Sequence, residues 1–314
     1  MADVVCTPPR TSREWRDATN STNRPVIVTA AIYSESDRHG GSFSVHANST
    51  TPSRRLIAGV QGLARRSPGL AIRAASTVHL ITDLVLDRET IHAACQAWRA
   101  TLPLAALHLH RVAPRKLPGM ELRWKHAADV LARVEWKCAF LIDLTDVSVL
   151  HLPACSAMAP RVHMASDFCV GGQRVRNLLH GAWDANKPAL DALSLGWRTA
   201  LSAWLTTGRA PSNAYALTMN CGVVGGPRAA LEPELRSVVA WLESNWKGTE
   251  VRNEAYSDML AWNAVALRLA SGASVVSGYP LGPVSHPMQG VLCSGHGRDA
   301  TRNCGTFGLS LIHI

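Results

Sequence analysis

The chain of 314 residues has 47% apolar residues and a formal net charge of +9 at neutral pH. This length can bury a sizeable core in one large or two modest domains, and the apolar content argues against an intrinsically disordered chain. No stretch approaches the roughly 18 apolar residues of a membrane-spanning helix, and the amino terminus has no signal-peptide core. We therefore expect a soluble protein without a membrane span, in the cytoplasm or the nucleus.

The positive charge suits a polyanionic partner or a nucleotide substrate. Many of the arginines stand singly along the chain, so a generic basic surface is an equally good interpretation. The cysteines are scattered without a C-x-x-C pair and are expected to be buried apolar residues or free thiols of a reducing compartment, with neither a zinc site nor a disulfide framework. The eight positions are Cys6, Cys95, Cys138, Cys155, Cys169, Cys221, Cys293 and Cys304.

The first half of the chain alternates between predicted strands and helices. Residues 1–24 are polar and predicted to be a flexible tail. Strands are predicted over 25–32, 78–82, 107–112 and 139–147, and helices over 52–66, 88–100 and 119–133. This alternation with short connections predicts an α/β fold with a mostly parallel central sheet flanked by helices. The sequence lacks G-x-G-x-x-G after the first strand and has no G-x-x-x-x-G-K-[ST], which excludes the usual dinucleotide fold and the P-loop enzymes.

His108 and His110 fall on the same face of the strand predicted over 107–112. They could form a metal-binding pair, but no acid or cysteine stands beside them in the sequence. We expect surface histidines or histidines with satisfied hydrogen bonds.

Two acids, Asp143 and Asp146, end the apolar strand predicted over 139–147. A buried strand is apolar throughout, so carboxylates at its tip lie where open α/β sheets bind ligands. Carboxylates held close together repel each other unless a cation lies between them, and a divalent ion that also binds phosphate oxygens meets this need. The alternative is that both acids cap the next turn.

The second half carries two further motifs. A strand predicted over 215–224 runs into N-C-G-V-V-G-G, where Asn220 and the glycines indicate either close approach of the backbone to a ligand or a tight turn before a helix over 229–246. Asp258 follows near the start of another helix, where it could also be a first-turn acid favoured by the helix dipole. Asn263, in the same motif, does not share a helix face with Asp258.

The last six residues, 309–314, match a hexapeptide encoded by a widely used sequencing-transposon end. We expect this segment to be an adapter-derived, non-native tail and the gene to be truncated near Gly308.

The order of Arg123-Trp124, apolar strand, D-x-x-D, N-x-G-V-x-G-G and D-M-x-x-x-N resembles that of the A-type (GT-A fold) glycosyltransferases over roughly 25–287. The resemblance implies a single GT-A-like catalytic domain over 25–308, with a nucleotide-binding half and an acceptor half. It further implies a metal-dependent enzyme that transfers a sugar from a nucleotide-sugar donor, with a UDP-sugar favoured.

In this family the residues of the motifs have distinct roles. The resemblance implies that the acid pair holds Mn²⁺ or Mg²⁺ on the donor diphosphate, that the arginine and the glycines contact the donor, and that the remaining amide and acid lie beside the sugar and the reacting centre. The matching positions are Asp143 and Asp146 for the metal, Arg123, Gly222, Gly225 and Gly226 for the donor, and Asn220 and Asp258 for catalysis.

Two features differ from the family pattern. The metal motif is usually D-x-D, whereas one more residue separates the acids here. Metal-dependent members of the retaining type also have a late histidine ligand, for which His286 and His296 are the candidates.

The sequence also resembles glucosyltransferases that modify hydroxymethylated pyrimidines in DNA, as in the base J pathway, and the +9 charge fits a DNA acceptor. A protein or small-glycan acceptor is equally compatible with the motifs. Two alternatives remain open: a basic, non-catalytic nucleic-acid-binding α/β protein, and a truncated transferase without activity.

Overall fold

The structure is a computed structural model. It describes residues 3–6, 24–32, 52–70, 77–84, 86–113, 119–144, 147–149, 152–167, 218–245, 258, 261–262, 265, 275–277, 284–285 and 310–312.

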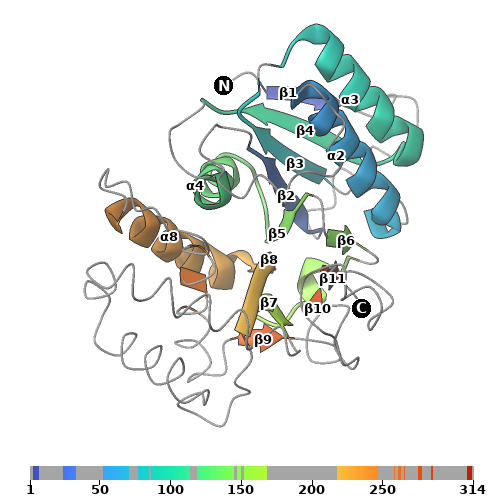
Figure 1. The fold of residues 1–314 in the computed structure, drawn as a ribbon. Coiled ribbons are helices and arrows are strands. Elements are labelled where there is room, and N and C mark those ends of the chain that lie inside the picture. The colour runs from blue at the N-terminus through green and yellow to red at the C-terminus, as the bar shows by residue number, and fades with distance from the viewer. Residues whose placement is uncertain are drawn as a thin grey trace, which may run out of the picture.

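A twisted eight-stranded sheet, in the order β1-β4-β3-β2-β5-β8-β7-β9, forms the centre of the fold (Figure 1). The middle strands β4, β3, β2 and β5 are parallel, whereas β1 and β8 are antiparallel to their neighbours in this group. The sheet is therefore mixed and mostly parallel at its centre, which confirms the predicted fold class. Its strands are β1 (Asp3–Cys6), β2 (Val26–Ala31), β3 (Thr77–Thr82), β4 (Ala106–Arg111), β5 (Cys138–Asp143), β7 (Val162–Asp167), β8 (Thr218–Pro227) and β9 (Val275–Ser277).

Helices cover both faces of this sheet. One face carries α2 and α3, and the other carries α4 and α8 (Figure 1). The helices are α2 (Pro52–Arg66), α3 (Arg88–Thr101), α4 (Gly119–Leu131) and α8 (Arg228–Asn245), with short 3-10 turns η1 (Pro68–Leu70) and η2 (Cys155–Ala157). Strand β2 shows how the sequence specifies two cores: Val26 and Val28 pack under α4 and α8, whereas Ile27 and Ala31 pack under α2 and α3.

The predicted elements of the first half agree with the observed ones to within two residues at most ends, and α2 coincides with the helix predicted over 52–66. Two predictions need correction. The predicted flexible tail 1–24 contains β1, which pairs with β4 along four residues. The fifth predicted strand continues as β8 to Pro227, because the segment with Gly225 and Gly226 pairs with β5 instead of forming a turn.

A second, three-stranded sheet joins β10 (Val284–Ser285), β11 (Ser310–Ile312) and β6 (Val147–Val149). Strand β11 runs parallel to β6, and β6 begins directly after Asp146 in the chain. The six residues predicted to be adapter-derived thus include a paired strand, and their non-native origin stays a prediction.

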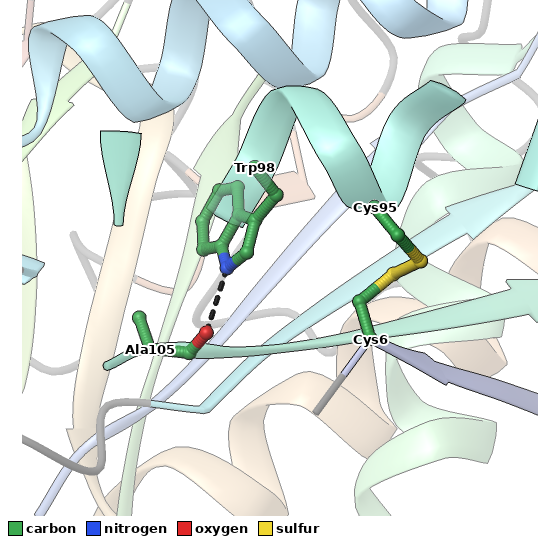
Figure 2. The surroundings of a disulfide bond; sticks show 4 residues. All are labelled: Cys6, Cys95, Trp98 and Ala105. Atoms are coloured by element: carbon green, nitrogen blue, oxygen red, sulfur yellow. Dashed lines mark hydrogen bonds between the residues drawn. A yellow bond between two sulfur atoms is a disulfide. The ribbon is translucent and has the colours of Figure 1, made fainter. Parts of the chain in front are cut away.

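A disulfide joins Cys6 of β1 to Cys95 of α3, with the Cα atoms 5.2 Å apart (Figure 2). Both half-cystines lie in the core on the α2 and α3 face. One helical turn further on, the indole of Trp98 donates a hydrogen bond of 2.8 Å to the Ala105 carbonyl (Figure 2). The disulfide fastens an edge strand to a helix that comes much later in the chain.

A second disulfide, Cys138–Cys155, joins the start of β5 to η2. It closes a loop that contains both Asp143 and Asp146, here called the acid-pair segment (residues 143–146). The expectation of free thiols is therefore wrong for four of the eight cysteines, because partners distant in sequence are brought together by the sheet and cannot be found from spacing.

Disulfides are typical of proteins that fold in oxidising compartments. The prediction of a cytoplasmic or nuclear location thus loses the support that it took from unpaired cysteines. No helix among the described residues has an apolar stretch long enough to cross a membrane.

Three histidines stack on the α4 side of the sheet: His79 of β3 with His108 and His110 of β4. His79 Nδ1 and His110 Nε2 are 2.8 Å apart, so one ring donates and the other accepts, as expected for histidines with satisfied hydrogen bonds. Burial, reinforced by the neighbouring rings of His108 and His110, lowers the pKa of His79 to about 3. His79 is therefore neutral in the folded protein at neutral pH.

Replacing both Cys138 and Cys155 by Ala should lower the free energy of unfolding by about 3 kcal/mol, because the loop of 17 residues is no longer closed in the unfolded chain. Urea unfolding of the two proteins measures this difference. In an excess of dithiothreitol the difference should disappear, and a difference that persists there would contradict the disulfide.

The stability of the protein should fall as the pH drops below about 6.5. The pKa of His79 is lower in the folded state, so the unfolded chain takes up the proton first, and this residue alone should remove about 2 kcal/mol between pH 7 and pH 5. Urea unfolding across this range measures the slope. His79→Phe keeps an aromatic ring and should flatten the slope; equal slopes in both proteins would contradict a neutral, buried His79.

Candidate active site

Asp143 is the last residue of β5, at the carboxyl end of the central parallel strands. It lies opposite Ala30 of the neighbouring strand β2, and its side chain is 21% exposed. The preceding residues of β5 are buried, so the chain leaves the core at this carboxylate. This is the edge at which open α/β sheets bind their ligands.

Helix α2 fixes the backbone that follows Asp143. Arg66 donates a hydrogen bond of 2.8 Å to the carbonyl of Leu144, and Gly59 leaves room for the Leu144 side chain, since a Cβ at Gly59 would approach it to 2.8 Å. The backbone N–H of Val149 donates to Ser67 Oγ at 3.2 Å. Together with the Cys138–Cys155 disulfide, these contacts hold both ends of the acid-pair segment.

Arg123 of α4 lies between two carboxylates that are far apart in sequence. Its Nη1 pairs with Asp143 Oδ1, and its Nη2 donates a hydrogen bond of 3.0 Å to Asp258 Oδ2. The Arg123 side chain is 13% exposed, so these charges interact in a largely desolvated setting. The sequence-predicted residues Arg123, Asp143 and Asp258 therefore meet at one place.

Asp258 is fully buried, and a second donor also holds its carboxylate. The indole Nε1 of Trp124 donates a hydrogen bond of 3.1 Å to the same Oδ2 atom that accepts from Arg123. Asp258, Ala261, Trp262 and Val265 are helical and buried at the spacing of one helix face. That face packs against the core under α4, which brings Asp258 to Arg123.

The three charged groups Arg123, Asp143 and Asp258 sum to one negative charge when ionised. A guanidinium between two carboxylates reduces their mutual repulsion. Asp143 is the carboxylate of this cluster that reaches solvent.

A small pocket of about 20 Å³ adjoins this ion-paired cluster. It lies between α4 and strands β2, β3 and β5, so its floor is apolar and its charged groups come from Arg123 and Asp143. A volume of this size is about that of one ordered water molecule. Its lining includes Ala30, Ile81, Arg123, Ala127, Leu141 and Asp143.

The glycines of β8 take different places. Gly222 directly precedes Val223, which pairs with Ile142, so Gly222 lies at the Asp143 end of β5, where the pairing of β8 with β7 is irregular. Gly225 and Gly226 lie at the opposite end of β5 and are not brought to Asp143. A Cβ at Gly225 would approach the Phe140 ring to 2.1 Å, so packing between strands explains this glycine.

Gly226 has a similar structural reason, because its Cβ would meet the carbonyl oxygen of Arg161 at 2.7 Å. The backbone of Asn220 lies in β8 opposite Ala165 of β7. The amide side chain of Asn220 lies outside the described residues, as do Asp146, Asn263, His286 and His296. The described residues include no group of three or more His, Cys, Asp or Glu side chains that could hold a metal ion.

Trp124 and Trp262 complete the surroundings of Asp258, and sequence reasoning did not assign them a role. Their rings meet edge to face, with centroids 5.2 Å apart. The signals were present: Trp262 follows Asp258 by four residues, which places both on one helix face, and Trp124 is adjacent to Arg123.

No family model matches the chain, and no curated protein matches it. Among solved structures it is similar to the galactosyltransferase LgtC in complex with donor and acceptor sugar analogues, at 12% identity over 91% of this chain and 86% of that chain, with a TM-score of 0.44. It is also similar to mouse xyloside xylosyltransferase 1 (9%, 78% and 82%, TM-score 0.40).

A third similar structure is core-mannan synthase A from Aspergillus fumigatus in a Mn/GDP form, at 10% identity over 86% of this chain and 77% of that chain, with a TM-score of 0.37. The first two are glycosyltransferases by name, and the third is a mannan synthase. Because identities are at most 12% and TM-scores lie below 0.5, a function for this chain depends on the residues of its own site.

Arg123→Met should lower the free energy of unfolding by about 3–5 kcal/mol, because it removes the ion pair between Arg123 and the buried carboxylate of Asp258. In the double variant with Asp258→Asn, the loss should be smaller than the sum of the two single losses. Urea unfolding of the four proteins measures this coupling.

Lys125→Met is the matched control, two residues along the same helix. Lys125 pairs with Glu243 at the surface, where both side chains are partly exposed, so its loss should cost less than about 1 kcal/mol. Equal losses for Arg123→Met and Lys125→Met would contradict a buried ion pair at Asp258.

Proposed function

We propose that the protein is a glycosyltransferase that moves a sugar from a nucleotide-sugar donor, with a UDP-sugar favoured, to an acceptor hydroxyl. The observation that carries the proposal is the meeting of Arg123, Asp143 and Asp258 beside a pocket at the carboxyl edge of the sheet. These residues come from three segments whose order in the chain resembles that of GT-A glycosyltransferases.

The reaction needs stabilisation of a departing diphosphate. The bond between the sugar C1 and the diphosphate oxygen breaks, and its electron pair leaves with the diphosphate. The acceptor oxygen forms the new bond to C1, and its proton passes to a basic oxygen of the departing diphosphate. Cationic groups placed where this negative charge develops lower the barrier.

Arg123 and Asp143 are suited to the donor side of the site. The Arg123 guanidinium can donate to phosphate oxygens in addition to its carboxylates, because it carries five N–H groups in a planar fork. Asp143 offers a partly exposed, hard oxygen ligand in the lining of the pocket. These properties fit a divalent cation.

Asp143 would hold Mn²⁺ or Mg²⁺ together with Asp146, and the ion would supply Lewis-acid stabilisation to the diphosphate. The shared Arg123 contact limits the freedom of Asp143 to turn away from the site. Asp146 belongs to a segment whose two flanks are fixed by α2 and by a disulfide.

Asp258 would accept hydrogen bonds from hydroxyl groups of the donor sugar or assist the acceptor. Its carboxylate is already held by two donors, so it needs no reorganisation to serve as an acceptor. Asn220 and Gly222 would lie on the sugar side, with Gly222 close to the Asp143 end of β5. The roles of Gly225 and Gly226 toward the donor stay predictions from the resemblance.

The nature of the acceptor follows from no single described residue. A DNA acceptor is a prediction from the resemblance and from the net charge of +9. The same charge would serve a nucleic-acid-binding protein without catalysis, which would bind DNA with steep salt dependence even when Asp143 is replaced.

Calorimetric titration of the protein with UDP in the presence of Mn²⁺ tests the proposal. The wild-type protein should bind UDP, and removal of the metal with EDTA or replacement Asp143→Asn should weaken this binding at least about tenfold, since both remove charge complementarity to the diphosphate. Glu243→Gln, in a surface ion pair on α8, is the control and should bind UDP as the wild type does. No UDP binding by the folded wild-type protein, with or without Mn²⁺, would reject the glycosyltransferase proposal.

A further inference from the structure

The carboxylate of Asp258 is held by Trp124, a residue to which the proposed function assigns no role. Its Oδ2 atom accepts a hydrogen bond of 3.0 Å from Arg123 Nη2 and one of 3.1 Å from Trp124 Nε1. We infer that Trp124 is a positioning residue: its indole N–H fixes the direction in which Asp258 presents its carboxylate to the sugar of the donor. The inference rests on the proposed function and adds a residue to its machinery.

The two hydrogen bonds to Oδ2 limit how the Asp258 carboxylate can turn. A guanidinium alone constrains a carboxylate weakly, because either oxygen can pair with either of its N–H groups as the carboxylate turns. A second donor on the same oxygen, from a rigid ring, removes this freedom. Trp124 is 2% exposed and Asp258 is fully buried, so no solvent replaces either hydrogen bond.

The Trp124 indole is held by the edge-to-face contact with Trp262, whose ring centroid is 5.2 Å away, and it lies beside the Arg123 guanidinium at 4.6 Å. Trp262 stands one helical turn after Asp258. Trp124 thus makes two contacts with the helical segment that carries Asp258: a ring contact with Trp262 and a hydrogen bond to Asp258.

The two tryptophans differ in the hydrogen bonds of their indole N–H groups. Trp262 is fully buried, and within the described residues its indole Nε1 has no hydrogen-bond partner. Trp124 and Trp262 therefore share one ring contact, but only the N–H of Trp124 reaches the carboxylate. Replacing each by Phe keeps an aromatic ring and removes one N–H, which makes the two variants a matched pair.

The expected effect is on the sugar and not on the nucleotide. UDP lacks the sugar, so its binding depends on the diphosphate side of the site, where Asp143 and Arg123 lie. A nucleotide sugar also needs a correctly turned Asp258. Loss of the Trp124 N–H should therefore weaken nucleotide-sugar binding while UDP binding stays nearly unchanged.

Calorimetric titration with UDP, UDP-glucose and UDP-galactose in the presence of Mn²⁺ tests the inference. The probe is the nucleotide sugar that the wild-type protein binds more tightly than UDP. Trp124→Phe should lower the affinity for this probe about tenfold and that for UDP less than about twofold, as expected for one lost hydrogen bond to a charged group. Trp262→Phe should change neither affinity more than about twofold. Asp258→Asn should lose the preference, and Trp124→Phe added to it should cause no further loss.

Two results would overturn the inference while leaving the proposed function intact. In the first, all variants bind UDP, and Trp124→Phe prefers the nucleotide sugar over UDP as strongly as Trp262→Phe does. In the second, adding Trp124→Phe to Asp258→Asn lowers the affinity for the nucleotide sugar further. Failure of the wild type to bind UDP rejects the proposed function itself.

A measurement on the wild-type protein covers the case in which Trp124→Phe does not fold. With ¹⁵N-labelled tryptophan, the indole N–H resonance of Trp124 should shift on addition of the preferred nucleotide sugar and much less on addition of UDP, whereas that of Trp262 should stay in place. Equal shifts of the Trp124 resonance with both ligands would overturn the inference.

Discussion

A buried carboxylate must have partners, and the structure around Asp258 follows from this constraint. Its charge lies in a fully buried position, where an unpaired carboxylate would cost several kcal/mol. Arg123 and Trp124 provide the partners, and both come from α4. The helix face with Asp258 must therefore pack against α4, which joins a late part of the chain to the parallel sheet of the first half.

The same constraint explains why one arginine serves two acids. Arg123 reaches the exposed end of β5 with one nitrogen and the buried Asp258 with another, so the orientation of α4 on the sheet determines the distance between the carboxylates. Packing of Leu122, Ala127 and Leu131 under this helix sets that orientation. A change in the apolar core can thus alter the spacing of the charges without touching them.

The spacing of residues in the sequence was sufficient to predict those elements that depend on neighbouring residues. The helix over 52–66 and the strands of the first half follow from the spacing of apolar residues, and Arg123, Asp143 and Asp258 could be selected from motifs. Their shared contact could not be predicted, because it depends on how distant segments pack. The same holds for β1, for both disulfides, and for Gly225, whose missing side chain reflects the Phe140 ring across the strand pair.

The disulfide between β1 and α3 also bears on how the protein can be produced. Strand β1 covers the outer edge of β4, whose N–H and C=O groups would otherwise be open to pairing with other chains. Four residues form this cover, and Cys6–Cys95 makes its attachment covalent. Synthesis in a reducing bacterial cytosol leaves this cover without its covalent attachment and favours aggregation through the open edge. An oxidising periplasm or a secretory host is the suitable place to express it.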